Sequence, residues 1–319
     1  MDDAGLRTHS VRRASEASFS VPESFVKRSE GFRRWAAVDR AAGSVHMGFG
    51  ICELDPQGSV DRHVHSFEES FYVLEGEVLS ETTEGSFLLR GGDYGFVPVG
   101  APHGWRNAGS EAARWVDMLA PQPDQNLGGS TFFLPPYSSE TSPETSPETS
   151  PIPIDVRDPR TRSFGHIEPE NMEVSRQTQD MLAVSASMRT ALLVYSGITV
   201  KMMVDSDLGS YLSTMFMVQY EPGGAAGVHD HPFEEAYLIL HDEVDAVFDH
   251  QEYRLSVGDV AFAGVGCPHA FDYPGTTNVR WLETQAPQPP ARHSYRFARD
   301  WEYLRGELMG PRAERGDDE

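Results

Sequence analysis

Short apolar runs, separated by turn-forming residues, extend through most of the chain. Segments 71–74, 86–89 and 94–97 combine aromatic and branched side chains over only a few residues each. Glycine, proline, aspartate and asparagine interrupt such runs at intervals of roughly 8–12 residues, which is typical of a β-sandwich or barrel. We therefore predict an all-β fold. Helix signals are weak, and one short helix is expected at 300–306.

This pattern of apolar runs and turns occurs twice. Residues Gly43–Pro123 align with Gly209–Pro289 without a gap, at a constant separation of 166 positions. Turn residues keep the same spacing, as Gly92-Asp93 and Gly258-Asp259 show. One long unit present twice predicts two similar domains, whereas a solenoid would show many short repeats.

A polar segment of repeated Glu-Thr-Ser-Pro separates the two units. It has nothing to bury and cannot offset its ordering entropy, so we expect a flexible linker. We predict an N-terminal domain with an N-terminal arm over 1–137, the linker over 138–158 and a C-terminal domain over 159–319. The arm, residues 1–40, is either partly disordered or packs on the other repeat as an edge strand.

Composition narrows the choice of partners. The chain of 319 residues has 26 Lys and Arg against 49 Asp and Glu, a formal net charge of −23. An acidic surface repels phosphate backbones and anionic lipids, so neither nucleic acid nor membrane is expected as a partner. No signal peptide or membrane span is visible, which favours a cytoplasmic location. The two cysteines, Cys52 and Cys267, are not equivalent in the repeat and are expected to be reduced.

A cluster of potential metal ligands lies in each repeat. Alternate residues of a strand face the same side, so His63 and His65 point together. Glu69 and His103 would complete a set of four, and the second repeat carries the same types at equivalent positions, namely His229, His231, Glu235 and His269. Imidazole suits iron, zinc, copper and nickel, and the carboxylate also allows manganese. We predict up to one divalent ion per domain, with two coordination positions left for a substrate, water or dioxygen.

These residues stand in a recognisable order. Gly58 with His63-x-His65-x3-Glu69-x6-Gly76 resembles the first motif of the cupin superfamily, and Gly92-x5-Pro98-x-Gly100-x2-His103-x3-Asn107 resembles the second. The second repeat keeps the ligands but has Asp242, Gly264 and Tyr273 at the glycine, proline and asparagine positions. The resemblance implies a bicupin, that is, two tandem cupin barrels (double-stranded β-helix, or jelly-roll) with a metal site inside each.

Strand alternation also predicts the residues around each metal. The substrate pocket would include Phe71 and Trp105 in the first repeat, and Tyr237, Phe271 and Tyr273 in the second. His241 would face inward too, and Tyr237 or His241 could then act as acid or base. The second pocket would be the more polar, so we favour it as the active one. Alternatively the aromatic residues only fill the barrels, and alternation fails wherever a strand has a bulge.

Three functions are open. By resemblance, cupins with this ligand set often hold ferrous iron, so the leading hypothesis is an Fe(II)-type dioxygenase acting on a small chelating substrate, a dihydroxyaromatic or dicarbonyl compound. The second is a non-redox hydrolase, isomerase or decarboxylase, since the layout is similar to that of the bicupin (S)-ureidoglycine aminohydrolases. The oxalate-degrading bicupins fit poorly, because they carry Trp where this chain has Val64 and Asp230.

The third hypothesis is a cupin that binds a small molecule without turnover. The intact double set of ligands weighs against it, but fold alone does not give function. Exposed barrel edges and the internal pairing of the repeats favour a homodimer as the assembly.

Overall fold

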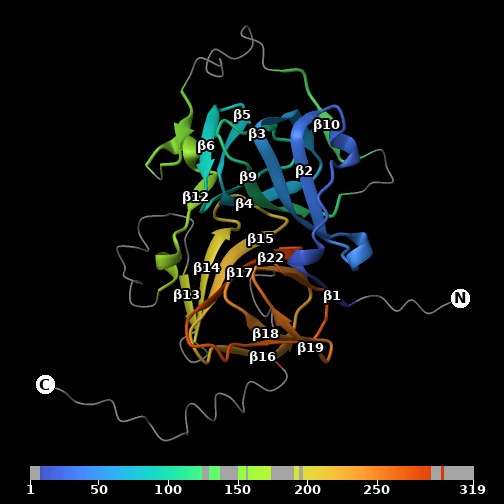
Figure 1. The fold of residues 1–319 in the computed structure, drawn as a ribbon, viewed down its shortest axis with the longest axis vertical. Helices are drawn as coiled ribbons and strands as arrows, with labels where there is room; N and C mark the ends of the chain where they lie inside the picture. The colour runs from blue at the N-terminus through green and yellow to red at the C-terminus, as the bar shows by residue number, and fades with distance from the viewer. Residues whose placement is uncertain are drawn as a thin grey trace, which may run out of the picture.

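The computed structural model describes residues 8–123, 129–136, 150–155, 157–173, 190–193, 197–288 and 296–297. Within these residues the elements are strands and short 3-10 turns, which confirms the all-β expectation. The strands form two stacked barrels, the first in blue to green and the second in yellow to red (Figure 1). The predicted helix at 300–306 and most of the predicted linker lie outside the described residues.

The first barrel is built around one long strand, β3 (Gly48–His65). Its first part pairs with β9 and its last part with β8, so the same strand belongs to both layers of the barrel. Gln57, with φ 64°, takes a left-handed conformation at the change of direction. The other strands are β2 (Ser29–Val38), β4 (Glu68–Glu75), β5 (Glu77–Thr82), β6 (Ser86–Arg90), β7 (Asp93–Val97), β8 (His103–Arg106), β9 (Ala113–Ala120) and β10 (Thr131–Phe133).

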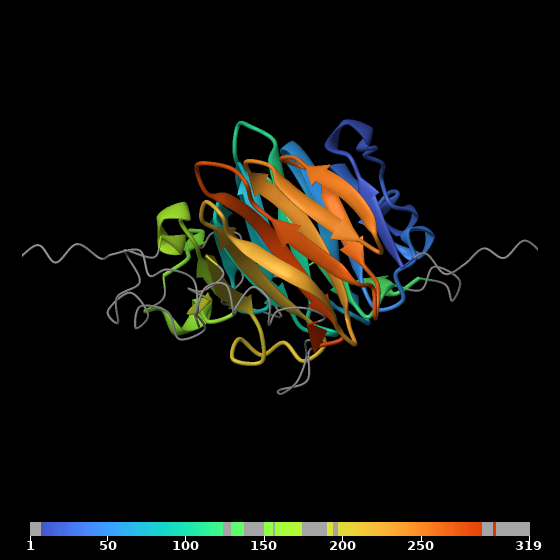
Figure 2. The same cartoon turned by 90° about the horizontal axis from the view of Figure 1, so that it is seen from below.

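The second barrel has two sheets, in the orders β1-β20-β17-β22-β15-β14-β13 and β19-β18-β21-β16-β23. Seen from below, its strands form a curled sheet (Figure 2). Its strands are β13 (Thr190–Leu193), β14 (Ile198–Val204), β15 (Thr214–Tyr220), β16 (Ala225–Asp230), β17 (Glu234–His241), β18 (Val244–Phe248), β19 (Gln251–Leu255), β20 (Val260–Ala263), β21 (His269–Asp272), β22 (Val279–Ala286) and β23 (Arg296–Phe297).

The two barrels exchange edge strands. In the N-terminal arm, β1 (His9–Arg12) pairs with β20 of the second barrel, which confirms the edge-strand alternative for those residues. In return, β12 (Phe164–His166) pairs with β7 of the first barrel, although it follows the predicted boundary at 159. The short β11 (Ile152–Pro153) pairs with β6. Each exchanged strand covers an edge that would otherwise expose unpaired backbone groups.

Equivalent carboxylates anchor both exchanged strands. Asp93 accepts a hydrogen bond from His166 Nδ1 at 2.8 Å, and Asp259, 166 residues later, accepts one from Arg13 Nη1 at 2.6 Å. The two barrels therefore hold their borrowed strands in the same way, although the donor residue differs.

A second reciprocal contact joins the barrels directly. The Glu234 carboxylate accepts hydrogen bonds from Ser44 Oγ at 2.7 Å and from the backbone N–H of Val45 at 2.7 Å. The equivalent Glu68 accepts from Ser210 Oγ at 2.7 Å and from the backbone N–H of Tyr211 at 3.0 Å. Each domain thus places one buried glutamate against a loop of its partner, the loop that precedes β3 or the loop that precedes β15.

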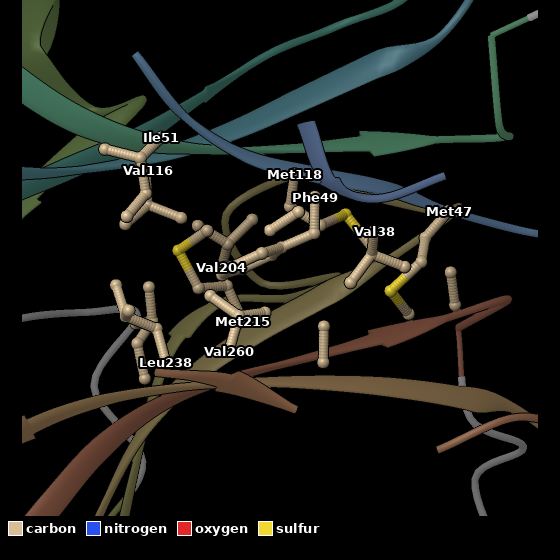
Figure 3. Close-up of a cluster of buried hydrophobic side chains, with 14 of the residues drawn as sticks. Val38, Met47, Phe49, Ile51, Val116, Met118, Val204, Met215, Leu238 and Val260 are labelled. Atoms are coloured by element: carbon tan, nitrogen blue, oxygen red, sulfur yellow. The ribbon is translucent and has the colours of Figure 1, made fainter. Parts of the chain in front are cut away.

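A shared apolar core lies between the barrels. Met47, Phe49 and Met118 of the first barrel face Met215 and Leu238 of the second, and all five are at most 1% exposed (Figure 3). Burying a side chain of this size stabilises a protein by roughly 1.5–3 kcal/mol. The two repeats therefore pack against each other through a common core and are not joined by the linker alone.

Candidate metal centres

The first cluster brings together residues from three strands. His63 and His65 lie on β3, Glu69 on β4 and His103 at the start of β8, and all four are buried. One ring nitrogen of each histidine lies within 4.8 Å of those of the other two. Glu69 Oε2 is 3.1 Å from His65 Nε2 and 3.5 Å from His103 Nε2.

These separations fit a metal ion. With metal–nitrogen bonds of about 2.1 Å, neighbouring donors on an octahedral ion lie about 3 Å apart. His103 Nε2 is buried and has no hydrogen-bond partner among the described residues, which is a costly state for a polar atom that has no cation to bind. The donor set of three imidazoles and one carboxylate suits divalent iron, manganese or zinc.

The backbone fixes the orientation of all six imidazoles. Each Nδ1 hydrogen-bonds a backbone carbonyl two residues away, so Nδ1–H is the donor and Nε2 carries the lone pair toward the cluster. The distances are 2.8 Å for His63, 2.6 Å for His65, 3.0 Å for His103, 2.8 Å for His229, 2.8 Å for His231 and 2.9 Å for His269. A histidine in this tautomer is ready to ligate through Nε2.

Electrostatics keep His63, His229 and Glu69 in their ligating forms. Burial lowers the pKa of His63 to about 3 and that of His229 to about 4, with the neighbouring histidines adding to the effect. Burial would raise the pKa of Glu69, but the neighbouring imidazoles of His103 and His65 outweigh it and hold the pKa below its usual range. The first cluster thus offers a neutral His63 imidazole and a charged Glu69 carboxylate at neutral pH.

A cavity of about 600 Å³ opens at the first cluster. His63, His65 and Glu69 line it at one place, while Phe32, Trp105 and Trp115 supply apolar walls. Arg34 and Asp117 add a charged pair to the same wall. Such a mixture, mainly apolar with a few convergent polar groups, is typical of small-molecule sites.

Arg34 is held firmly in that wall. Its Nε and Nη2 donate to the two oxygens of Asp117 at 2.6 Å each. Burial disfavours the guanidinium charge, but the charge and hydrogen bonds of Asp117 outweigh it and raise the pKa of Arg34. Gly50 makes the space, because a Cβ there would lie 2.7 Å from the guanidinium carbon.

The second cluster has the same ligands but different neighbours. Glu235 Oε2 lies 2.6 Å from His231 Nε2 and 3.4 Å from His269 Nε2. Tyr237 Oη donates a short hydrogen bond to the same Glu235 oxygen and lies 3.1 Å from His269 Nε2. Gln285 Nε2 donates to the other Glu235 oxygen at 2.5 Å. Tyr237 therefore lies at the second cluster, and both Tyr237 and Gln285 bond to a metal ligand.

A further buried carboxylate, Glu283, interacts with Glu235 of the second cluster. Glu283, the counterpart of Asp117, is buried and accepts a hydrogen bond from Trp281 Nε1 at 3.0 Å. Burial, together with the charge of Glu235, raises the pKa of Glu283 well above its usual range. The position equivalent to Arg34 in the strand register is Val200, so no arginine compensates this carboxylate from there.

The predicted pocket residues divide into two groups. Phe71 and Trp105 pack on each other beside the first cluster, at 5.1 Å between ring centroids, and Phe271 lies 5.0 Å from Tyr237 at the second. Tyr273 forms the second group: it is buried, but its hydroxyl donates to Asp242 at 2.5 Å and not to a cluster residue.

The inward orientation expected for His241 is wrong. The ladder between β17 and β22 shifts register between Ile239 and His241, and His241 is exposed as a result. A bulge reverses the side that a residue faces, so strand alternation alone could not place it. The structure does not bring His241 to the second cluster.

Sequence reasoning missed Arg34, Asp117 and Gln285. Asp117 and Glu283 carried a usable signal, because both follow an aligned Arg-Trp pair in the repeat. Arg34 carried none, since it precedes the repeated segment and pairs with a residue 83 positions away.

Both cysteines are free and buried as expected, and Cys52 Sγ donates to Asp117 at 3.3 Å.

Known proteins resemble this chain in sequence and in fold. The Cupin_2 cupin-domain family matches residues 50–119 and 216–284. Polyketide synthase CurC of Streptomyces cyaneus is 34% identical over 93 residues, which make up 28% of this chain and 59% of that protein. The chain therefore spans less than two thirds of that relative's length.

Two solved structures show the shared fold. Salicylate 1,2-dioxygenase from Pseudoaminobacter salicylatoxidans superposes with a TM-score of 0.63 at 15% identity, covering 88% of this chain and 81% of the other. Oxalate decarboxylase from Lactobacillus farciminis superposes with a TM-score of 0.59 at 15% identity, covering 94% and 93%. Among the described residues, no helix is long and apolar enough to cross a membrane.

Proposed function

This chain is a bicupin, with a three-histidine set in each of its two cupin domains, and from that premise we propose that it is an iron(II)-dependent dioxygenase whose first domain turns over the substrate. The observation that carries the proposal is the cavity of about 600 Å³, into which His63, His65 and Glu69 face. A metal enclosed without such space could only support the fold.

The substrate we propose is a small chelating compound, a dihydroxyaromatic or a dicarbonyl. The aromatic walls formed by Phe32, Trp105 and Trp115 suit a flat, apolar body. The related CurC is named a polyketide synthase, and polyketides carry carbonyl and phenol oxygens on alternate carbons, an arrangement suited to chelation. Iron bound by the four ligands would have two open positions, and it would supply a Lewis acid and a redox centre for the substrate held there.

The protein's own residues have three tasks in this proposal. The backbone carbonyls that bind each Nδ1 hold the imidazoles with Nε2 inward, so little reorganisation is needed when the ion binds. Phe32 and Trp105 keep water away from the bound substrate. Arg34 uses two of its five donors on Asp117, and we assign its Nη1 end to a negatively charged or enolic oxygen of the substrate.

Metal analysis tests the first part of the proposal. Protein purified without added metal is analysed by mass spectrometry, together with His63→Ala/His65→Ala. Iron in the wild type, at a content that falls by about one ion per chain in the variant, supports the proposal. Zinc or manganese alone, with substrate consumed under anaerobic conditions, would favour the hydrolase, isomerase or decarboxylase alternative.

A further inference from the structure

Tyr237 places a phenol oxygen beside the second cluster. Its Oη contacts Glu235 Oε2 and lies 3.1 Å from His269 Nε2. The side chain is 1% exposed and extends from β17, two residues after Glu235, so both residues face the same side. The phenol oxygen therefore lies next to two of the metal-binding atoms, Glu235 Oε2 and His269 Nε2.

The distance to His269 is what two neighbouring ligands of one ion would show. With bonds of about 2.1 Å, adjacent octahedral donors are about 3 Å apart. Oη and His269 Nε2 meet that separation as closely as Glu69 Oε2 and His65 Nε2 do at the first cluster, at 3.1 Å in both cases. We propose that Tyr237 is a fifth protein ligand of the second metal ion.

The surrounding residues support this assignment. Gln285 holds the remaining oxygen of Glu235 at 2.5 Å, so Oε2 is left for the ion once Tyr237 has lost the proton that it donates there. The first domain has Phe71 and Leu119 at the two equivalent positions, and neither can donate or accept a hydrogen bond. The difference between the domains is thus a matched pair of substitutions, both of which add polar groups to the second cluster only.

The consequence is a division of labour between the two ions. Three imidazoles, one carboxylate and one phenol oxygen leave a single open position on a six-coordinate ion. A chelating substrate by itself needs two, so the second ion does not carry out the proposed reaction. Coordination releases the phenol proton to solvent, as metal binding does for other protonated ligands. The inference depends on metal binding by the second cluster and not on the dioxygenase activity.

Absorption spectroscopy of the ferric protein tests this ligand. The variant His63→Ala/His65→Ala leaves the second cluster as the intact one, and it is loaded with iron and oxidised. We expect a visible charge-transfer band from iron–phenolate coordination, and tyrosinate vibrations in the resonance Raman spectrum excited in that band. Adding Tyr237→Phe should remove both, and metal content and circular dichroism are measured in parallel.

The first domain supplies the matched control. His229→Ala/His231→Ala retains the first cluster with Phe71 and should show no such band when iron is bound, whereas adding Phe71→Tyr should create one. Iron bound at the second cluster without a band would overturn the proposal, and so would a band that survives Tyr237→Phe. If Tyr237→Phe fails to bind iron or to fold, the presence or absence of the band and the tyrosinate vibrations in His63→Ala/His65→Ala still decides whether Tyr237 is a ligand.

Discussion

Phe71 and Tyr237 occupy equivalent positions 166 residues apart, and only the tyrosine brings an oxygen to its histidine cluster. Phe71 instead packs against Trp105 and leaves the first cluster facing a cavity. The two barrels therefore surround the same set of ligands with different residues. The first cluster has a cavity beside its ligands, and the second has the additional donors Tyr237 and Gln285.

The difference between Phe71 and the equivalent Tyr237 predicts how a substitution at position 71 affects activity. Phe71→Tyr should lower the turnover rate at least about tenfold, because a hydroxyl beside Glu69 would compete for a position that the substrate needs. Steady-state kinetics with iron-loaded protein measures the effect, and iron content is determined for each sample. Phe71→Leu serves as the control, since it alters packing without adding a donor. Equal losses in both variants would contradict the explanation.

The pair of Arg34 and Asp117 makes a prediction for stability. Arg34→Ala leaves the buried Asp117 without its charged partner, which should lower the free energy of unfolding by about 3–5 kcal/mol. Arg34→Val/Asp117→Leu removes both charges and should recover most of that loss. Urea unfolding at one pH measures all three proteins. A single variant that loses less than about 1 kcal/mol would mean that Asp117 is solvated or has another partner.

Arg34 also makes a prediction for binding. Arg34→Lys keeps a charge but cannot form the same two-point contact with Asp117, so it should raise KM for an anionic substrate more than it lowers kcat. The paired measurement uses a substrate analogue in which the anionic oxygen is a methyl ether. If the analogue and the substrate respond equally to Arg34→Lys, the guanidinium does not bind that oxygen.

The contact between the domains predicts the effect of removing one carboxylate. Glu234→Ala takes away the acceptor for Ser44 Oγ and for the backbone N–H groups of Val45 and His46. Ser44 is buried, and leaving a buried donor unpaired costs about 1–3 kcal/mol, so we expect a loss of about 2 kcal/mol. Glu234→Gln keeps one acceptor and should lose less. Thermal unfolding measures both, and Glu68→Ala should resemble Glu234→Ala because it removes the equivalent contact.

His166 predicts how stability changes with pH. The hydrogen bond with Asp93, opposed by burial, raises the pKa of His166 to about 9. A group whose pKa is raised on folding stabilises fully below its unfolded pKa of about 6.5, and this contribution disappears as pH rises through about 9. Stability should therefore fall between pH 6.5 and 9 in the wild type and fall less in His166→Gln. Because the imidazole side chain is 40% exposed, the difference between the wild type and His166→Gln will be small. Parallel curves of stability against pH for the two proteins would contradict the prediction.

Much of this architecture could be predicted because it depends on local rules. Histidines two residues apart on a strand face the same side, and the constant spacing of 166 residues repeated the ligand set, so the two clusters followed from sequence. The exchanged strands β1 and β12 could not be predicted in full, since pairing partners across domains leave no periodic signal. His241 was misplaced because a single bulge reversed its side.

The sequence favoured the second pocket as the active one, whereas we propose the first. The polarity of Tyr237 was recognised, but a hydroxyl in a barrel can face a substrate or bond to its own neighbours. Only the arrangement of Glu235, Gln285 and Tyr237 shows that the second applies. Sequence also gave no indication that Gly50 makes room for Arg34, because that contact joins a strand of the arm to the barrel.

Oxygen uptake is the most direct test of the proposed function. Iron(II)-loaded protein is mixed with catechols and 1,3-diketones in an oxygen electrode, alongside His63→Ala/His65→Ala and His229→Ala/His231→Ala. We predict substrate-dependent oxygen consumption that is abolished in the first variant and reduced to a lesser extent in the second. Consumption that depends on the second cluster alone, or turnover of substrate without oxygen, would contradict the assignment of a dioxygenase site to the first domain.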